Sequence, residues 1–276
     1  MNSCAVDVLI PTRDRAGALA ITLTALYAQQ VRDYRVIVSD QSEQASAFDA
    51  PEVQALLRIL AAAGRSVETH RHVPRRGMAE QRAFLLSRVS APYCLFLDDD
   101  VVIEPDLIGR LFEAIQRERC GFVGSALHGL SFIDDVRPHQ QAIDFWDGGV
   151  KPETVPLESA AWERHRLHSA ANLFHLQTRL RLTRAYARLY RVAWIGGCVL
   201  FNTEKLRAAG GFEFWRELPV EHCGEDVLAQ LRVMQRFGGS GIIPSGAYHL
   251  ELPTTVSKRD VNAPFLLWPR AQQVPG

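Results

Sequence analysis

The chain has 276 residues, of which 47% are hydrophobic and 22% charged, an ordinary globular composition. Its 31 basic and 31 acidic residues leave no net charge, which argues against a nucleic-acid partner because general polyanion binders carry a basic excess. No stretch is apolar over the roughly 18 residues that a membrane-spanning helix needs. The N-terminus lacks a leader pattern, and the 5 scattered cysteines form no CxxC pair. These features predict a cytoplasmic protein with reduced thiols.

The first half of the chain alternates short apolar runs with segments of helical periodicity. Strands are predicted at 6–11, 34–39, 67–72 and 93–97, and helices at 16–30, 53–63, 77–88 and 105–117. Strands separated by helices of this length indicate right-handed βαβ units around a parallel sheet.

The second half has a different pattern. We predict a strand at 121–125, a loop over 127–157, a long helix over 160–192, a strand at 194–201, helices at 204–209 and 223–237, and an irregular tail from residue 244. No linker-like composition separates the halves near residue 125. We therefore expect one compact α/β unit.

Three aspartates, Asp98, Asp99 and Asp100, follow the predicted strand 93–97. Ligands of such sheets bind beyond the carboxyl ends of the strands, where Asp40 also lies, so one crevice could collect all four carboxylates. Adjacent like charges repel, and Mg²⁺ or Mn²⁺ removes this repulsion while joining carboxylates to substrate phosphates. The simpler alternative is an acidic loop before a helix. We favour a metal site because a helix start does not need three adjacent aspartates.

Six segments, in order, resemble the family 2 nucleotide-sugar glycosyltransferases of the GT-A fold. They are VDVLIPTRDR, VIVSDQS, GMAEQR, FLDDDVVIEPDLI, WIGGCVLFN and GEDVLAQLR. No single motif is decisive, but six in this order are specific. The resemblance implies one GT-A domain over 1–276, an α/β fold with a mostly parallel central sheet flanked by helices. A Rossmann-like nucleotide-sugar-binding half (1–125) would be fused to an acceptor-binding half (126–276) that includes a variable helical region (160–192).

The resemblance also implies a site for the donor nucleotide. Pro11, Thr12 and Arg13 match the turn along the nucleobase, with Arg13 in place of the usual aromatic residue; a guanidinium can also stack on a base. Asp40 matches the aspartate that accepts a hydrogen bond from the base. Arg82, five residues after a glycine, would direct a cation toward the diphosphate or the acidic cluster. From the residues alone, the turn and the arginine could equally be structural.

In the acidic cluster, the resemblance implies that Asp98 or Asp99 contacts the ribose and that Asp100 is a metal ligand. His249 falls where some family members have a metal-binding histidine, although a lone histidine is more often a structural hydrogen-bonding group. The implied cofactor is a divalent metal, Mn²⁺ or Mg²⁺.

A second acidic pair, Glu225 and Asp226, begins the predicted helix 223–237. The family has an acidic pair before an apolar helix, and its aspartate is the catalytic base, so we assign Asp226 to this role with Glu225 as second choice. Acids in a first helical turn also complement the helix dipole. Trp194, Gly196 and Gly197 match the segment beneath the donor sugar and acceptor, although a core tryptophan and a bulged strand would give the same pattern.

The predicted helix 160–192 is rich in arginine. On a helix of 100° per residue, Arg181, Arg184, Arg188 and Arg191 would share a sector of roughly 80°. Such a stripe beside an apolar face over 179–191 predicts either contact with an anionic membrane surface near a lipid-linked acceptor or a core helix with solvated arginines.

These observations together predict an inverting, metal-dependent glycosyltransferase. It would move a sugar from a UDP-linked donor to a hydroxyl of a glycan or lipid-linked acceptor, in the cytoplasm or at the inner face of the cell membrane. One alternative is a sugar nucleotidyltransferase, although residues 12–17 are a poor version of its glycine-rich loop. Another is a non-catalytic nucleotide-sugar-binding protein, which would not need Asp226. A phosphate-loop NTPase is unsupported because GxxxxGK[ST] is absent.

Overall fold

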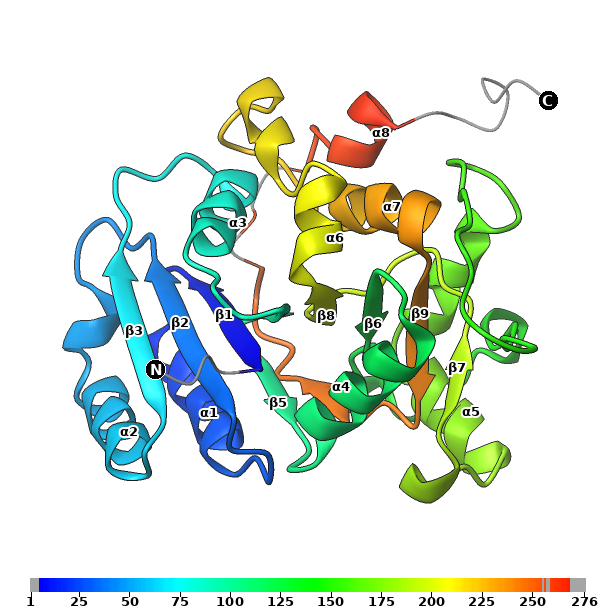
Figure 1. Cartoon of the computed structure of the whole chain (residues 1–276), viewed down its shortest axis with the longest axis horizontal. Coiled ribbons are helices and arrows are strands. Elements are labelled where there is room, and N and C mark those ends of the chain that lie inside the picture. The colour runs from blue at the N-terminus through cyan, green and yellow to red at the C-terminus, as the bar shows by residue number, and fades with distance from the viewer. Residues whose placement is uncertain (1–4, 255, 257–258, 269–276) are drawn as a thin grey trace.

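A computed structural model describes residues 5–254, 256 and 259–268 of the chain, and its centre is an eight-stranded sheet (Figure 1). The strands of this sheet, in spatial order, are β3 (Ser66–Arg71), β2 (Tyr34–Asp40), β1 (Val6–Thr12), β4 (Tyr93–Leu97), β8 (Cys198–Asn202), β6 (Phe122–Gly124), β9 (Gly239–Ile243) and β7 (Arg188–Tyr190). A small antiparallel sheet pairs β5 (Val101–Ile103) with β10 (Ala247–His249).

The pairing of β1, β2, β3 and β4 is parallel throughout, as predicted. Thr12 at the end of β1 stands opposite Asp40 at the end of β2. Strand β8 then runs antiparallel to β4 and β6. The carboxyl ends of β1, β2 and β4 therefore lie along one edge, where the acidic turn begins.

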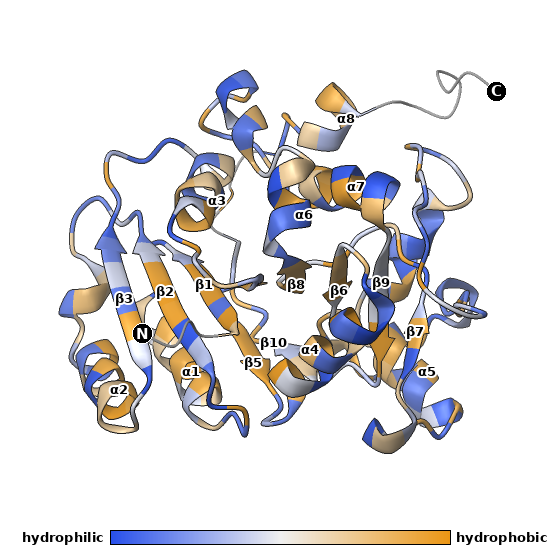
Figure 2. Cartoon of the chain, in the orientation of Figure 1, coloured by the Kyte–Doolittle hydropathy of each residue, from blue (hydrophilic) through white to orange (hydrophobic). Residues whose placement is uncertain are grey.

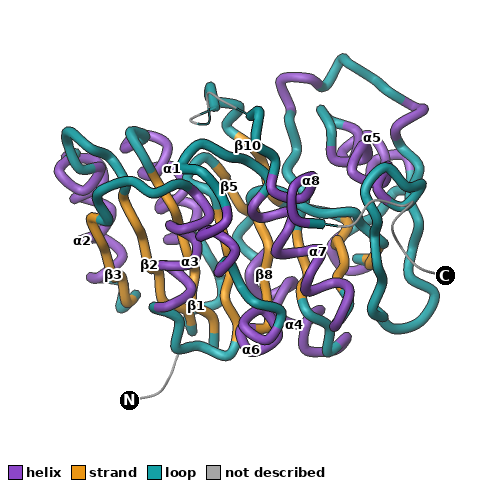
Figure 3. The backbone as a smooth tube through the Cα atoms, turned by 90° about the horizontal axis from the view of Figure 1, so that it is seen from above, coloured by secondary structure: helices purple, strands orange, loops and turns teal. Residues whose placement is uncertain are grey.

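Helices cover both faces of the sheet (Figure 3). One face packs against α1 (Ala16–Tyr27), α2 (Pro51–Ala62) and α4 (Leu107–Glu118), and the other against α3 (Met78–Ser87), α6 (Thr203–Ala208) and α7 (Glu225–Phe237). The short helices α5 (Asn172–Arg179) and α8 (Ala263–Leu267) belong to the second half. Short 3-10 helices occupy Ala47–Asp49, Leu130–Phe132, Pro138–Gln140, Trp162–His168, Arg184–Tyr186 and Glu213–Glu217.

Each central strand contributes side chains to both cores. Val8 and Val36 face the layer of α1 and α2, whereas Leu9 and Ile37 face the layer of α3 and α7. Burial on both faces explains why these strands are continuous apolar runs rather than alternating ones. Figure 2 shows this apolar character on β1 and β2.

The predicted helix over 160–192 is wrong. The segment contains a 3-10 turn at Trp162–His168, α5, a second turn at Arg184–Tyr186, and β7, which pairs antiparallel with β9. Arg181 has a φ of 51°, a left-handed conformation that an α-helix cannot contain. The predicted membrane-facing stripe over 179–191 therefore does not form.

Two arginines of the predicted stripe over 179–191 have intramolecular partners instead. Arg184 lies 3.0 Å from Glu104, and Arg191 lies 3.3 Å from Asp144. In the described part of the chain, no helix has the length and apolarity needed to cross a bilayer.

Three further boundaries differ from the sequence prediction. The strand predicted at 194–201 begins only at Cys198, because Gly197 has a φ of 75°. Strand β9 follows α7 directly, and the tail predicted to be irregular contains β10 and α8. Residues 255, 257–258 and 269–276 of this tail lie outside the described residues.

Candidate active site

Both acidic sites predicted from the sequence open into one cavity of about 400 Å³ beyond the carboxyl ends of β1 and β4. Asp98, Asp99 and Asp100 line it from the turn after β4, and Glu225 and Asp226 line it from the start of α7. The wall also includes Pro11, Thr12, Arg13, Arg82 and His249. The two carboxylate groups can therefore act on one ligand.

Arg82 of α3 connects these two acidic sites. Its Nε donates to Glu225 Oε1 at 2.9 Å, and its Nη2 donates to Asp98 Oδ1 at 2.9 Å. The side chain is 6% exposed. Burial lowers the pKa of Arg82, but the charges of Asp98, Glu225 and Asp226 outweigh it and raise the pKa above its ordinary value. Arg82 is thus a fixed cation in the cavity wall.

The glycine that precedes α3 explains how Arg82 reaches this position. Gly77 has a φ of 99°, and a Cβ there would lie 2.7 Å from a ring atom of His222. The close approach lets His222 Nε2 accept the amide hydrogen of Ala79 at 3.1 Å. The start of α3 is therefore held against the loop before α7, and Arg82 faces Glu225.

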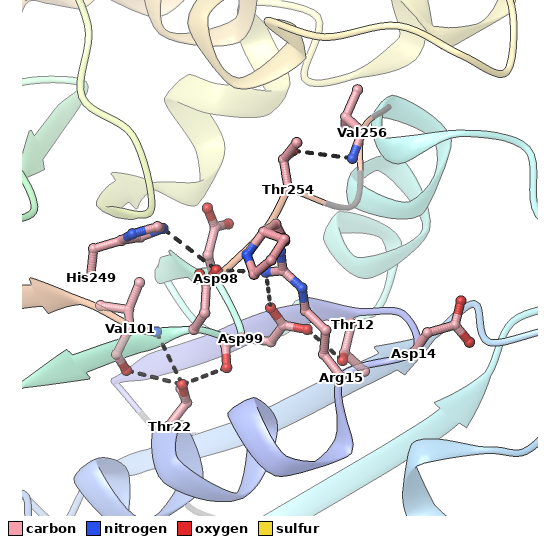
Figure 4. A network of polar contacts seen from close by, with 12 residues as sticks. Thr12, Asp14, Arg15, Thr22, Asp98, Asp99, Val101, His249, Thr254 and Val256 are labelled. Atoms are coloured by element: carbon pink, nitrogen blue, oxygen red, sulfur yellow. Dashed lines mark hydrogen bonds and ion pairs between the residues drawn. The ribbon is translucent and has the colours of Figure 1, made fainter. Parts of the chain in front are cut away.

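The acidic turn is held from below by β1 and α1 (Figure 4). Thr12 Oγ1 donates to Asp99 Oδ2 at 2.6 Å, and Thr22 Oγ1 donates to the Asp99 carbonyl at 2.8 Å. Burial of its carboxyl raises the pKa of Asp99 to about 7. Asp99 is therefore held against β1 and α1, whereas the side chain of Asp98 is 35% exposed.

Asp100 has two basic neighbours. Arg15 Nη1 lies 2.5 Å from its Oδ2, and His249 Nε2 lies 3.5 Å from the same oxygen. Burial alone would raise the pKa of Asp100, but hydrogen bonding and charge from His249, together with the Arg15 guanidinium, lower it. Arg15 was not among the site residues predicted from the sequence. The only local signal for this residue in the sequence is its position directly before α1, four residues after Pro11.

The two acids at the start of α7 differ in environment. Glu225 is buried and its carboxylate is committed to Arg82. Asp226 has a pKa raised to about 7, first by burial and then by the neighbouring Glu225 charge. A carboxyl group that gains and loses a proton near neutral pH is suited to general-base chemistry, so the environment favours Asp226 over Glu225 for that role.

The structure does not bring Asp40 into the cavity. Its Oδ1 accepts hydrogen bonds from the amide and hydroxyl of Ser42 at 2.8 and 2.5 Å, and its Oδ2 accepts from Ser46 Oγ and the Ala47 amide, both at 2.8 Å. Four donors occupy the lone-pair positions of a carboxylate. Asp40 therefore organises the loop after β2 rather than facing a base.

A second cavity, of about 450 Å³, shares His249 and Leu252 with the first. Trp194 and Gly196 line it, and the Trp194 ring is nearly parallel to that of His165 at 6.0 Å. Gly197 approaches the acidic turn instead: its carbonyl accepts the Asp98 amide hydrogen at 2.9 Å. The three residues predicted to lie beneath the sugars thus divide between the second cavity and the acidic turn.

Comparison with known proteins identifies the family of this chain. Residues 7–175, more than half of the chain, match the family described as Glycosyl transferase family 2. The chain belongs to this family. Membership of this family favours glycosyl transfer over both alternatives considered from the sequence. A search of curated proteins gave no match.

Solved structures share the fold of this family 2 glycosyltransferase. The mannosyltransferase PcManGT from Pyrobaculum calidifontis, in complex with GDP-Man and Mn²⁺, has a TM-score of 0.52 and 16% identity, covering 95% of this chain and 56% of the solved chain. S. aureus TarS 1–349, in complex with UDP-GlcNAc, has a TM-score of 0.52 and 12% identity, covering 91% and 60% respectively. The chain spans less than two thirds of either solved chain. The likeness shows that the fold is the GT-A type.

The acidic turn of this family 2 glycosyltransferase has donor atoms of the kind that Mg²⁺ and Mn²⁺ prefer. Among the residues described, no three His, Cys, Asp or Glu side chains are grouped to hold a metal ion. These ions, however, commonly bind through one or two carboxylates and complete their coordination with substrate phosphates. Asp98 and Asp100, both at the cavity wall, fit that requirement.

His249 fits the role of a metal ligand less well than the resemblance implied. Its Nδ1 accepts the amide hydrogen of Glu251 at 2.9 Å, which leaves the ring proton on Nε2, the nitrogen nearest Asp100. A neutral imidazole that binds a metal through Nε2 carries its proton on Nδ1. In this structure His249 is therefore a hydrogen-bond donor toward Asp100.

Proposed function

We propose that this glycosyltransferase is inverting and metal-dependent, and that it transfers a sugar from a UDP-linked donor to a hydroxyl of a glycan or lipid-linked acceptor. The observation that carries the proposal is the bridge by Arg82 between Asp98 and Glu225, next to Asp226 in one cavity. A fixed cation between a phosphate-binding turn and a general base matches the needs of a reaction in which a diphosphate leaves as a hydroxyl attacks.

The donor nucleotide would occupy the cavity against the β1 turn. In the proposal, Pro11, Thr12 and Arg13 border the base and Asp98 contacts the ribose, since Asp99 is buried and bonded to Thr12. Asp40 would act indirectly, by holding the loop after β2. Residues 1–125 would supply most donor contacts.

Asp226 would act as the base. The acceptor hydroxyl attacks the anomeric carbon on the face opposite the diphosphate while its proton passes to the Asp226 carboxylate. The new carbon–oxygen bond forms as the bond to the diphosphate oxygen breaks, so the anomeric configuration inverts. Arg82 would stabilise the negative charge that grows on the leaving diphosphate. Glu225, paired with Arg82, would keep that guanidinium in place.

Asp100 would hold the divalent cation, which would complete its coordination with the phosphates of the donor. When bound, such a cation supplies further charge neutralisation for the leaving diphosphate. The solved complex of PcManGT with GDP-Man and Mn²⁺ supports a metal in a protein of this fold.

The acceptor would enter from the second cavity. Trp194 offers an apolar ring of the kind on which sugars stack, and Gly196 leaves the backbone open beside it. The cavity shares His249 and Leu252 with the donor cavity. Residues 126–276 would thus form most of the acceptor site.

A thermal-shift panel of nucleotides and nucleotide sugars, each with and without Mn²⁺, tests the proposal. Stabilisation by a ligand follows RT ln(1 + [L]/Kd), so one panel reports both the preferred base and the metal requirement. We expect UDP and a UDP-sugar to raise the unfolding temperature, and Mn²⁺ to increase that shift. Preference for GDP would correct the donor, and shifts that are identical without Mn²⁺ would contradict metal dependence.

A further inference from the structure

Arg15 occupies the position beside Asp100 that the proposed metal would need. Figure 4 shows its side chain next to that of Asp99 in the same turn. Its Nη1 lies 2.5 Å from Asp100 Oδ2 and 3.5 Å from Asp99 Oδ1, and its side chain is 14% exposed. We propose that Arg15 is a resident counter-ion of the acidic turn, which a divalent cation displaces from Asp100, and that this displacement releases residues 250–254 from Arg15. The inference rests on the proposed metal-dependent function.

The competition follows from the geometry at one oxygen. A guanidinium 2.5 Å from Asp100 Oδ2 uses one of the two lone pairs of that oxygen, which would bind Mg²⁺ at about 2.1 Å. His249 Nε2 faces the same oxygen at 3.5 Å. A metal at this oxygen would stand next to a second, unscreened cation unless the Arg15 side chain moved away.

In the ion pair between Arg15 and Asp100, the Arg15 side chain is the partner that can move. Thr22 Oγ1, on the same helix α1 that Arg15 precedes, donates to the carbonyl of Asp99 and accepts the Val101 amide hydrogen at 3.2 Å. These bonds fix α1 to the acidic turn on both sides of Asp100. The turn cannot retreat from Arg15 without breaking them, whereas an arginine side chain has several rotatable bonds.

The other end of the guanidinium reaches the C-terminal part of the chain. Arg15 Nη2 donates to the carbonyl of Pro253, and the Leu250 amide donates to the carbonyl of Asp100 at 2.9 Å. Leu252 and Thr254 on this segment line the donor cavity. Arg15 therefore ties one wall of the cavity to the acidic turn, and a metal that displaces Arg15 removes this tie.

The first test measures the affinity for Mn²⁺ alone, by electron paramagnetic resonance of free Mn²⁺. Arg15→Gln removes the competing charge, and we expect it to bind Mn²⁺ at least about fivefold more tightly than the wild type. Arg15→Lys keeps the charge but not the forked geometry, and should remain near the wild-type affinity. Arg259→Gln removes a charge from the same cavity wall and serves as the matched control. Equal affinities of Arg15→Gln and the wild type, or no Mn²⁺ binding by any of the four proteins, would overturn the inference.

The second test measures hydrogen exchange of the amides in residues 250–254. We expect saturating Mn²⁺ to speed exchange there in the wild type, and Arg15→Gln to exchange fast with or without Mn²⁺. Unchanged wild-type exchange in Mn²⁺ would refute the release of this segment. Neither readout depends on turnover, so their failure leaves glycosyl transfer through Asp226 standing, whereas failure of the proposed function is seen in the activity of Asp226→Asn.

Discussion

Arg82 Nε donates to Glu225 Oε1 at 2.9 Å across a separation of 143 residues in the chain. The contact joins α3, which follows β1, β2 and β3, to α7, which carries the proposed base. Both side chains are at most 7% exposed. A buried ion pair at this point fixes the position of the acidic turn relative to the start of α7, which carries the proposed base.

Replacement of Arg82 should impair both catalysis and stability. We expect Arg82→Ala to lower kcat at least about 100-fold, because the growing charge on the diphosphate loses a fixed cation. It should also lower the free energy of unfolding by about 3 kcal/mol, because Glu225 keeps a buried charge without its partner. Steady-state kinetics and urea unfolding measure these effects. Arg88→Ala, on the exposed residue directly after α3, is the control; comparable kinetic losses in both variants would contradict a specific role for Arg82.

The pH dependence of transfer should follow the Asp226 carboxyl. Its pKa is raised to about 7, so the group is protonated and inactive as a base below that pH, and kcat/KM should rise as the pH passes upward through about 7. Glu225→Gln removes a neighbouring negative charge that raises this pKa, and should move the acidic limb to lower pH. If the acidic limb of the pH profile lies at the same pH in Glu225→Gln as in the wild type, the pH dependence does not come from Asp226.

Gly77 should tolerate no side chain. A Cβ at its φ of 99° would meet His222 at 2.7 Å, and relief of that clash would displace α3 and Arg82. We expect Gly77→Ala to cost about 1–3 kcal/mol of stability and to weaken donor binding. Gly17→Ala is the matched control, because nothing lies within 4 Å of a Cβ there. Isothermal titration and urea unfolding distinguish the two, and equal behaviour would refute the packing argument.

A buried histidine, His128, and a partly buried one, His168, should make the fold sensitive to acid. Burial lowers the pKa of His128 and of His168 to about 4, whereas an unfolded histidine takes up its proton near 6.5. Between these values the unfolded state binds more protons, so stability falls as the pH drops from about 6.5 toward 4. Each group contributes up to about 3 kcal/mol. His128→Gln should show a shallower decline than the wild type in unfolding followed from pH 7 to 4.5; parallel declines would contradict this assignment.

The N-terminal half of the fold was predictable because its constraints are local. The apolar runs at β1, β2 and β4 reflect burial on both faces of a central sheet, and the acidic triplet follows the strand that presents it. The acidic pair at Asp226 was located by its motif at the start of a helix, and it lines the same cavity as the triplet. Strand order and loop direction do not alter these features.

The remaining features depend on contacts that are distant in the chain. Residues 188–190 form a strand only because β9 lies beside them, so local periodicity predicted a helix. The role inferred for Arg15 depends on its contact with Asp100, which lies 85 residues later in the chain. Asp40 was placed correctly at a strand end, but the direction of its carboxylate is set by the donors of its own loop, Ser42, Ser46 and Ala47.

The most direct test of the account compares donor affinity and transfer rate in Asp226→Asn. The substitution keeps the size of the side chain and removes its ability to accept a proton. We predict that the dissociation constant of the nucleotide-sugar donor in Mn²⁺ stays within about threefold of the wild type, while transfer to the acceptor falls by a factor on the order of 10³. Transfer at the wild-type rate in a variant that still binds the donor would contradict the assignment of Asp226 as the base.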